Sequence, residues 1–558
     1  MGTFVIRKNV MLFNTARAIR QKKIDSVKSE KFDLLVIGGG ITGAGIALDA
    51  ASRGIKTVLI EKNDYASGTS SKSTKLIHGG LRYLKNFEFG LVREVGHERE
   101  IVWRNAPHLV HPEKMLLPIT KDGSLSKLTA SAAIYLYDYL AGVKASERRK
   151  MLSAAETLKL EPGLNPEGLT GAALYTEYRT DDARLTIELI KTATQYGATA
   201  INYVKAQKPI YENGKIAGFE VRDEFSGELF FVRAAGVINA AGPWVDEIRQ
   251  SDKSLQGKHL KLSKGVHLVF PFKKLPINQS VYIDVKGDKG RMVFVIPRGR
   301  AVYAGTTDTF YEDVDNPNVT KEDVSYILSA VNAMFPSAEL KDSDVESTWS
   351  GLRPLIMEEG KSASELSRKD ELFISPSGMV SIAGGKLTGY RKMAERSIDA
   401  WLSLHAGMKE KLKPGHTQHI LLSGADFGNR RVFLENLRDT CGQIPNSMSL
   451  LEDLFEKYGS NTQKIVDLAY DLYNENRDLT HPLLLAELAY SIDEEQAATL
   501  SDFFVRRTGM LYFNRIKITE FRSLLDPYFQ SYLGFDDVLF EELKADFDKV
   551  YHEVVNFH

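Results

Sequence analysis

A glycine-rich loop at residues 38–43 (GGGITG) constrains the fold of this chain more than any other feature. Residues 31–37 (KFDLLVI) before it are typical of a buried parallel strand, and residues 44–52 after it are rich in small helix-forming side chains. A second short strand is expected at 57–60 (TVLI). The segment therefore predicts a βαβ unit of about 30 residues.

The loop also has the chemistry of a phosphate site. Gly38, Gly40 and Gly43 permit a tight turn, a close approach of the backbone to a pyrophosphate, and close packing of helix on strand. Thr42 lies where the following helix begins, and the unpaired N–H groups there favour phosphate. Glu61 ends the second strand, where its carboxylate can accept hydrogen bonds from a ribose. These five residues are predicted to bind a dinucleotide.

The identity of the dinucleotide follows from two further observations. The carboxylate at position 61 argues against NADP, and the sequence has no second GxGxxG segment. A flavoprotein reduced by a nicotinamide nucleotide would need such a second loop. If the single dinucleotide is FAD, as we expect, the substrate itself must deliver the hydride to it.

The chain changes character after this unit. Its 558 residues exceed what one core can hold, so two or three domains are expected. Residues 259–308 are rich in strand-forming side chains, with a hairpin-like break at 297–300 (PRGR), and beyond residue 410 the pattern is almost wholly helical. The predicted fold class is α/β: a Rossmann-like FAD-binding domain, an inserted antiparallel-sheet substrate domain and an all-helical C-terminal domain. The expected boundaries are 1–30 for a basic N-terminal arm, 31–115, 185–250 and 350–400 for the discontinuous FAD-binding domain, 116–184 and 251–349 for the substrate domain, and 401–558 for the helical domain.

Composition excludes several classes of function. The net charge of -1 argues against a nucleic-acid-binding protein. Cys441 is the single cysteine, which excludes an internal disulfide, a Cys-ligated iron–sulfur cluster and a Cys-rich zinc site, and fits a cytoplasmic location. No metal site is predicted. The first 30 residues are basic with interleaved apolar side chains, so two alternatives stay open: a solvated arm, or a segment that lies on an anionic membrane surface at the inner face of the cell membrane.

Two stretches carry a family resemblance. Residues 37–54 (IGGGITGAGIALDAASRG) and 384–394 (GGKLTGYRKMA) resemble the signature segments of FAD-dependent glycerol-3-phosphate dehydrogenases of the aerobic, quinone-linked type. Between them, in the family's order, lie SSKSTKLIHGGLRYL, EYRTDDARL, NAAGPWVD, KGVHLVF, GTTD and SGLRPL. The resemblance runs from about residue 32 to 400, and the helical tail resembles the family's C-terminal domain.

The resemblance implies oxidation of sn-glycerol 3-phosphate to dihydroxyacetone phosphate by hydride transfer to FAD, with the electrons passed to a membrane quinone. The alternative is a glycerol-3-phosphate oxidase that passes the electrons to O2 and gives hydrogen peroxide. An amino-acid oxidase would recognise a carboxylate and would lack the helical tail, and a flavin-binding scaffold without turnover is the remaining alternative. The oligomeric state stays open, and a homodimer is compatible with the sequence.

Arginine suits a phosphate dianion because its planar fork donates two parallel hydrogen bonds. Arg353, in GLRP, and Arg368, in SRKD, occupy the family's substrate-phosphate and active-site positions. Arg82 and Tyr83, which close HGGLRY, are the next candidates, Arg82 for substrate binding and Tyr83 for catalysis. A surface ion pair is the alternative for each arginine.

Oxidation of C2 also requires a base, since its hydroxyl loses a proton as the hydride leaves. His267, on the strand-like KGVHLVF, is the first candidate, and a structural histidine is the alternative. Lys386, after two glycines at the start of a helix, is expected to place positive charge where the reduced flavin becomes negative. Asp308 of GTTD could cap a turn or act on the substrate. The remaining expected cofactor contacts are Ser70, Ser71 and Lys75 around the pyrophosphate or ring, His78 on the ring, Gly242 beneath the adenosine half, and Gly385, Leu387 and Thr388 beside Lys386.

Overall fold

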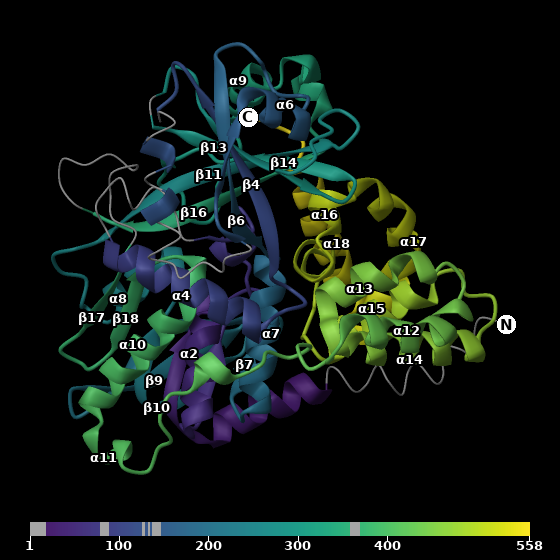
Figure 1. Ribbon diagram of the computed structural model, residues 1–558. Helices are drawn as coiled ribbons and strands as arrows, with labels where there is room; N and C mark the ends of the chain where they lie inside the picture. The colour runs from purple at the N-terminus through teal and green to yellow at the C-terminus, as the bar shows by residue number, and fades with distance from the viewer. Residues whose placement is uncertain are drawn as a thin grey trace.

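The computed structural model describes residues 18–78, 89–124, 129–131, 134–136, 147–288, 290–357 and 369–557. Two sheets and a helical region form three parts of the molecule (Figure 1). The first sheet lies at the lower left of that view, the second sheet above it, and the C-terminal helices, yellow-green to yellow, at the right.

The first sheet contains the predicted βαβ unit. Within the described residues it has eight strands, and its central path runs β17-β18-β10-β1-β2-β7, with β8 and β9 continuing from β10. The central strand β1 pairs in parallel with β2 and with β10. The strands are β1 (Lys31–Ile37), β2 (Thr57–Ile60), β7 (Thr199–Ile201), β8 (Val204–Glu212), β9 (Lys215–Asp223), β10 (Leu229–Asn239), β17 (Asp370–Ile374) and β18 (Val380–Gly384).

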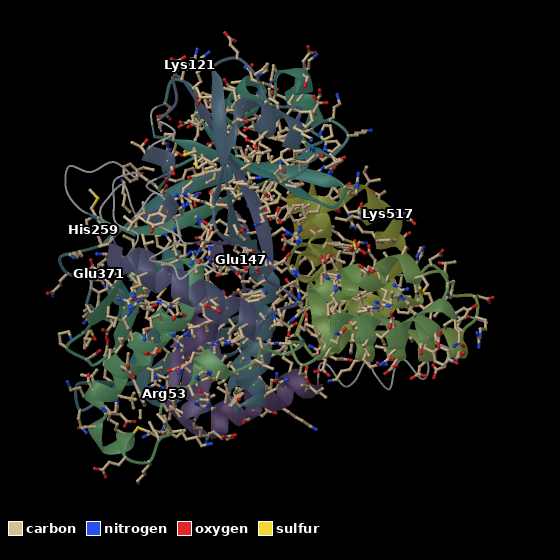
Figure 2. The ribbon with its side chains drawn as sticks, viewed as in Figure 1. Arg53, Lys121, Glu147, His259, Glu371 and Lys517 are labelled. Carbon is tan, nitrogen blue, oxygen red and sulfur yellow. The ribbon has the colours of Figure 1, made fainter. Side chains whose placement is uncertain are left out.

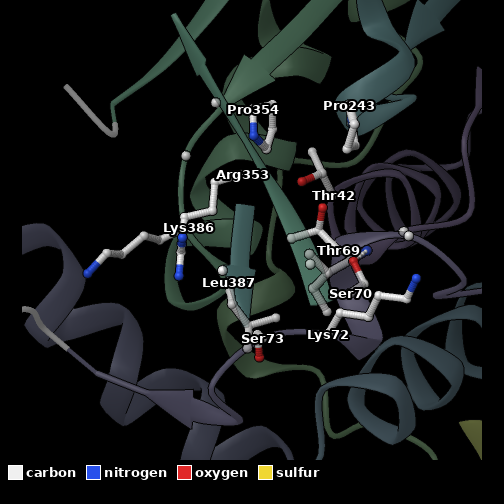
Figure 3. A pocket seen from close by; sticks show the side chains of 18 of the residues that line it. Thr42, Thr69, Ser70, Lys72, Ser73, Pro243, Arg353, Pro354, Lys386 and Leu387 are labelled. Atoms are coloured by element: carbon white, nitrogen blue, oxygen red, sulfur yellow. Dashed lines mark hydrogen bonds between the residues drawn. The ribbon is translucent and has the colours of Figure 1, made fainter. Parts of the chain in front are cut away.

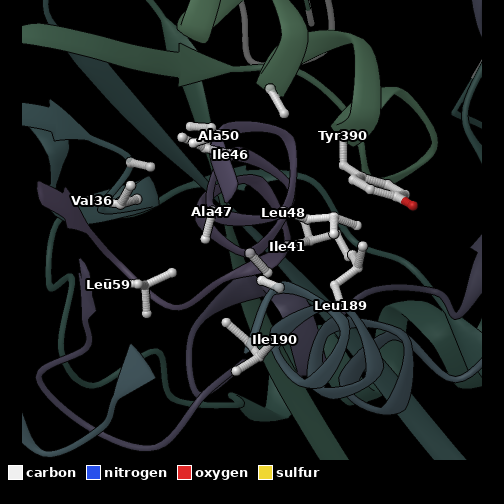
Figure 4. Close-up of a cluster of buried hydrophobic side chains, with 14 of the residues drawn as sticks. Val36, Ile41, Ile46, Ala47, Leu48, Ala50, Leu59, Leu189, Ile190 and Tyr390 are labelled. Atoms are coloured by element: carbon white, nitrogen blue, oxygen red, sulfur yellow. The ribbon is translucent and has the colours of Figure 1, made fainter. Parts of the chain in front are cut away.

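Three helices pack around this sheet: α2 (Ile41–Arg53), α7 (Asp182–Gln195) and α10 (Tyr390–Leu404). Helix α2 is almost entirely buried and ends at Gly54, which adopts the left-handed conformation with φ 94°. Figure 4 shows its side chains, including Ile46 and Leu48, in one apolar cluster with Leu189 of α7 and Tyr390 of α10. The small residues of α2 thus allow the two other helices to approach it closely. A further helix, α4 (Phe89–Asn105), lies beside them.

The second sheet is mostly antiparallel, as predicted. Its described strands number ten, in the order β15-β11-β14-β13-β12-β4-β6-β3, with β16 added to β11 and β5 to β6. Strand β16 belongs to this sheet along its whole length, although residues 350–356 had been expected in the FAD-binding domain. The strands are β3 (Leu76–Ile77), β4 (His111–Thr120), β5 (Lys150–Ser153), β6 (Leu169–Arg179), β11 (Leu260–Pro271), β12 (Ser280–Asp284), β13 (Met292–Arg298), β14 (Ala301–Gly305), β15 (Thr309–Phe310) and β16 (Ser347–Ile356). Helices α6 (Ala154–Leu160) and α9 (Lys321–Met334) accompany the sheet, and α9 shares its core.

The C-terminal region is helical, as predicted, but it has two cores. One cluster joins α12, α13, α14 and α15 to one another. A second cluster joins α15 and the last helices to Trp349, Tyr303 and Val269 of the second sheet. The elements are α11 (Ala406–Lys409), α12 (Arg430–Gly442), α13 (Leu451–Tyr458), α14 (Thr462–Glu475), α15 (Pro482–Asp493), the π-helix η10 (Asp502–Arg507), α16 (Met510–Phe513), α17 (Arg515–Leu533) and α18 (Asp537–Glu553). Figure 2 shows Lys517 of α17 at the right of the view, far from Arg53 at the end of α2 at the lower left.

Part of the segment expected as a basic arm is folded. Residues 18–29 form a helix, and its side chains Ile24 and Val27 are 2% and 1% exposed in a core shared with β8, β9 and β10. Arg20 forms an ion pair of 2.7 Å with Asp223. A loose arm is therefore wrong for residues 18–30, while residues 1–17 lie outside the described part of the chain. None of the described helices combines the length and the apolar character that a bilayer-crossing helix needs.

Candidate active site

A continuous cavity lies between the two sheets. It starts at the carboxyl ends of β1, β2 and β10 and extends to β11 and β16 of the second sheet. Parallel strands of this kind bind ligands at that end of the sheet. Of the predicted site residues, the following line the cavity: Gly38, Gly40, Thr42, Glu61, Ser70, His78, Gly242, His267, Arg353, Gly385, Lys386, Leu387 and Thr388.

The glycine loop forms one wall of this cavity by means of its backbone. Gly38 has φ 113°, and a methyl group there would lie 2.5 Å from the carbonyl oxygen of Ala240. A methyl group on Gly43 would overlap the carbonyl oxygen of Gly38, so Gly43 allows α2 to pack on β1 and lies behind the wall rather than in it. Gly40 and Thr42 line the cavity at the start of α2.

Glu61 and Ser70 complete the wall on either side of the loop. The Glu61 carboxylate accepts hydrogen bonds from the backbone N–H groups of Gly39 at 2.7 Å and Asn63 at 2.9 Å. Burial nonetheless raises the pKa of Glu61 above its ordinary value. The Ser70 hydroxyl accepts from the N–H of Ile41 at 2.9 Å, at the N-terminus of α2. A carboxylate for a ribose beside a helix N-terminus for a pyrophosphate fits the adenosine diphosphate half of FAD.

Ser71 and Lys75 do not reach the cavity. The Lys75 ammonium donates to the Asp182 carboxylate at 2.5 Å and to the Ser71 carbonyl oxygen at 3.2 Å, and both side chains of the ion pair are buried. Asp182 also accepts from Ser73. These residues fix the loop to α7 from behind, in contrast to their expected position around the cofactor.

The segment after β18 forms the opposite wall. Gly385 has φ 83°, and a methyl group there would overlap the sulfur of Met393. Lys386 precedes a short 3₁₀ turn, η6 (Leu387–Gly389), so the helix expected from Lys386 begins only at Tyr390 as α10. The Thr388 hydroxyl accepts from the N–H of His78 at 3.1 Å. Figure 3 shows Arg353 and Lys386 on one side of the cavity and Thr42, Thr69 and Ser70 on the other.

Strand register brings His267 and Arg353 to one face of the second sheet. On β11 and β16, His267 lies opposite Trp349 and Gly265 lies opposite Gly351. Alternate side chains of a strand share a face, so Arg353 joins Trp349 on the side of the cavity. Gly265 leaves space for the guanidinium of Arg353, because a methyl group there would overlap it.

His267 is buried and uncharged. Its ring stacks on Trp349 with centroids 4.7 Å apart and planes 12° apart, and its Nε2 lies 3.0 Å from the Thr74 hydroxyl. Burial, with Arg353 and Lys75 nearby, holds the pKa of His267 well below its ordinary value. A neutral imidazole at the cavity wall can accept a proton.

Two arginines meet at Asp308. Arg291 donates to the Asp308 carboxylate at 2.9 Å and to its backbone carbonyl at 3.0 Å. Arg353 lies 3.6 Å from the same carboxylate and donates to the Thr306 hydroxyl at 2.9 Å. Asp308 therefore orients two guanidiniums that both line the cavity. This role differs from the turn cap that the sequence suggested for it. Arg291 is not among the residues predicted from the sequence, because Arg291 lies in no recognised motif.

Aromatic side chains at this end were also missed. Tyr282 and Phe294 stack with centroids 4.1 Å apart on neighbouring strands β12 and β13, and Tyr175 of β6 lines the cavity with them. In the sequence these aromatic residues are marked only by the alternation of apolar and polar side chains along their strands, which does not distinguish a cavity wall from a core. Arg82, Tyr83 and Arg368 lie outside the described residues.

Comparisons with known proteins agree with this geometry. Residues 33–391 match the family described as FAD dependent oxidoreductase, and residues 415–537 match the C-terminal domain of alpha-glycerophosphate oxidase. The chain is 45% identical to the aerobic glycerol-3-phosphate dehydrogenase of Bacillus subtilis, over 96% of this chain and 97% of the relative. It is 47% identical to the enzyme of the same name from a Staphylococcus aureus strain, over 90% of this chain and 91% of the relative.

Solved structures give the same result. The glycerol-3-phosphate dehydrogenase from Bacillus halodurans, complexed with FAD, superposes with a TM-score of 0.82 at 42% identity, covering 97% of this chain and 98% of that one. An L-alpha-glycerophosphate oxidase from Mycoplasma pneumoniae, with FAD bound, matches at a TM-score of 0.55 and 19% identity over 67% of this chain and 95% of that one, which shows a shared fold. By these matches the chain belongs to the FAD-dependent oxidoreductases, as a member of the glycerol-3-phosphate dehydrogenase family, and FAD is its cofactor.

Proposed function

We propose that this protein oxidises sn-glycerol 3-phosphate to dihydroxyacetone phosphate and passes the electrons from FAD to a membrane quinone. The observation that carries the proposal is that His267, Arg291 and Arg353 line the same cavity as the glycine loop. FAD, when bound, accepts the hydride that leaves C2 of the substrate.

The two arginines supply the charge for the substrate phosphate. Among the ion pairs of the described residues, Arg291 and Arg353 share the carboxylate of Asp308, so two guanidiniums face one negative charge there. A phosphate dianion can accept hydrogen bonds from both guanidiniums, which Asp308 holds in place. In this proposal Arg353 binds the phosphate as expected from the sequence, and Arg291 is added to it.

His267 takes the proton of the C2 hydroxyl in this proposal. It is held neutral by its surroundings, and Thr74, which lines the cavity, lies at hydrogen-bond distance from its Nε2. The stacked Trp349 fixes the plane of the ring. Lys386 supplies positive charge at the wall where the cofactor becomes negative on reduction. Roles for Arg82, Tyr83 and Arg368 remain predictions from the sequence.

The choice of quinone over O2 is supported by the relatives. Those at 45% and 47% identity are named aerobic glycerol-3-phosphate dehydrogenases, whereas the oxidase structure is only 19% identical. A quinone resides in the membrane, so we also propose a peripheral location at the inner face of the cell membrane, with the basic N-terminus as a contact.

The test is an anaerobic bleach of the flavin followed by a choice of acceptor. Glycerol 3-phosphate should bleach the flavin absorbance, and a quinone analogue should restore it faster than air-saturated buffer does. No bleaching would contradict the substrate. Rapid oxygen uptake without another acceptor would favour the oxidase alternative.

A salt-dependent liposome sedimentation assay tests the membrane contact. Full-length protein should sediment with anionic vesicles at low salt, and protein without residues 1–17 should sediment less. Equal sedimentation of both would contradict a role for this segment.

A further inference from the structure

The segment after β2 lines the cavity with most of its residues but turns two side chains away from it. Glu61, Lys62 and residues 67–70 face the cavity, whereas Asp64 and Tyr65 between them are 0% and 1% exposed and point behind the wall. We call residues 61–70 the wall loop. What binds Asp64 therefore determines where this loop lies.

Asp64 is bound by two consecutive arginines of the helical region, more than 400 residues later in the chain. Arg506 Nε lies 2.5 Å from Asp64 Oδ2, and Arg507 donates to both oxygens, at 2.7 and 2.8 Å. Arg507 is fully buried, and Arg506 is 11% exposed. The two guanidiniums outweigh the effect of burial and hold the pKa of Asp64 below its ordinary value, so the carboxylate is charged.

The local helix geometry explains how neighbouring side chains reach one carboxylate. Both arginines end the π-helix η10 (Asp502–Arg507). A π-helix has a wider turn than an α-helix and frequently occurs at functional sites. Arg507 also donates to the backbone carbonyl of Glu495 at 2.8 Å, which anchors it within the helical region.

From Asp64 the contacts continue directly to the glycine loop. The N–H of Ala66 donates to the carbonyl oxygen of Gly39 at 3.0 Å, and the ring of Tyr65 packs so closely that a methyl group on Gly39 would lie 2.8 Å from it. Ala66 has φ 61°, which a residue with a side chain adopts only when its surroundings enforce it. Burial, and after it the charge of Arg506, lowers the pKa of Lys72, a cavity-lining residue, to about 8.

We propose that Arg506 and Arg507 are positioning residues for FAD, which hold the wall loop against the glycine loop through Asp64. The helical region is then part of the cofactor site without touching the cofactor. FAD affinity depends on the helical region, and FAD binding stabilises that region in return, because the coupling between two sites is reciprocal. The proposal rests on FAD as the cofactor and is independent of the proposed substrate and acceptor.

A purely structural ion cluster would behave differently. Removal of such a cluster would lower the melting temperature of the protein with and without FAD alike, and it would leave the rate of FAD release unchanged. The measurement is therefore the rate at which FAD leaves the diluted holoenzyme, followed by flavin fluorescence, alongside the melting temperatures of both forms.

Asp64→Asn, Arg507→Met and the double variant form the test. Each single variant should accelerate FAD release about tenfold, and the double variant should be no worse than the more severe single one, since both act through one contact. Turnover should return to near the parent value in excess FAD. Additive effects, or unchanged release with a lower melting temperature, would overturn the proposal.

Lys457→Met is the matched control. Lys457 pairs with Glu487 inside the helical region and makes no contact with the wall loop. Its loss should lower the melting temperature and leave FAD release unchanged. If Arg507→Met fails to fold, Arg506→Lys and Arg507→Lys keep the charge and should give smaller increases in release.

The unmodified protein offers an independent test by hydrogen exchange. Addition of FAD to the apoprotein should slow exchange in residues 502–507 as well as in residues 61–70. Protection confined to the wall loop and the glycine loop would contradict the coupling.

Discussion

The wall of the cavity at the glycine loop depends mainly on the backbone, whereas the wall from the second sheet depends on side chains. In the first, Gly38 and Gly43 are needed because a side chain at either position would overlap the backbone, and the N-terminus of α2 lines the cavity. In the second, the register of β11 and β16 brings His267 and Arg353 to one face, and Arg291 joins them from the residue before β13. Backbone sites require particular residues at fixed spacing in one segment. Side-chain sites can be assembled from segments that are far apart in the sequence.

The first prediction concerns the backbone wall and has the largest expected effect. Gly43→Ala should abolish FAD binding, since the added methyl group overlaps the carbonyl oxygen of Gly38, and should cost about 4 kcal/mol or more in the free energy of unfolding. The measurements are the flavin absorbance of purified protein and a denaturant titration. Gly407→Ala, at a glycine with open space around it, is the control and should retain its full content of bound FAD.

The second prediction removes the base from the side-chain wall. His267→Asn should lower kcat by about 10²- to 10⁴-fold, the usual contribution of general base catalysis, while FAD stays bound. Stopped-flow measurement of anaerobic flavin reduction isolates this step. A normal reduction rate would assign His267 a structural role.

The third prediction weakens the phosphate site. Arg291→Met should raise KM for glycerol 3-phosphate about tenfold or more, through loss of a charge-assisted hydrogen bond of about 1.5–3 kcal/mol. Reduction by glycerol, which has no phosphate, should change much less. An equal effect on both substrates would show that Arg291 supports the fold and not the phosphate.

The fourth prediction concerns pH and affects the stability of the fold alone. Burial holds the pKa values of His267 and His108 well below 6.5. Just below pH 6.5 these two imidazoles therefore bind protons in the unfolded chain but not in the native state. The free energy of unfolding should therefore fall as the pH falls below 6.5, by about 1.4 kcal/mol per pH unit for each histidine. Urea titrations between pH 7 and pH 5 measure the slope.

His108→Leu provides the matching control for that slope. His108 is fully buried where the helical region meets the first sheet, next to Gly424 and Gly459, and takes no part in the proposed chemistry. The variant should reduce the slope and leave substrate turnover unchanged. An unaltered slope would assign the pH dependence to the carboxylates.

The contrast between the walls also explains what the sequence could predict. The glycine loop, the strand before it and Glu61 lie within 31 residues, and their roles follow from local rules of conformation. The hairpin at 297–300 and the helical tail were likewise local patterns, and the structure has both. Local patterns are sufficient where the chemistry resides in one segment.

Non-local placement could not be predicted. Ser71 and Lys75 are polar like Ser70, yet the Ser71 hydroxyl donates to the Gly68 carbonyl oxygen and Lys75 pairs with Asp182 of α7, since the direction of a side chain in an irregular loop depends on its partners. Arg291 meets Arg353 through Asp308 because the segments before β13 and β15 and the strand β16, which are far apart in the sequence, come together in the second sheet. The ion pairs of Asp64 with Arg506 and Arg507 connect positions more than 400 residues apart, and no short pattern encodes such a contact.

The core that the last helices share with the second sheet has a consequence for biosynthesis. Thr348 donates to the carbonyl oxygen of Val554, and Trp349, beneath His267, packs on Tyr512. A nascent chain exposes the glycine loop early, but the surface beneath His267 stays uncovered until α16–α18 emerge from the ribosome. We therefore expect the active enzyme to form only after release of the complete chain, and chains that terminate early to be substrates for chaperones and proteases.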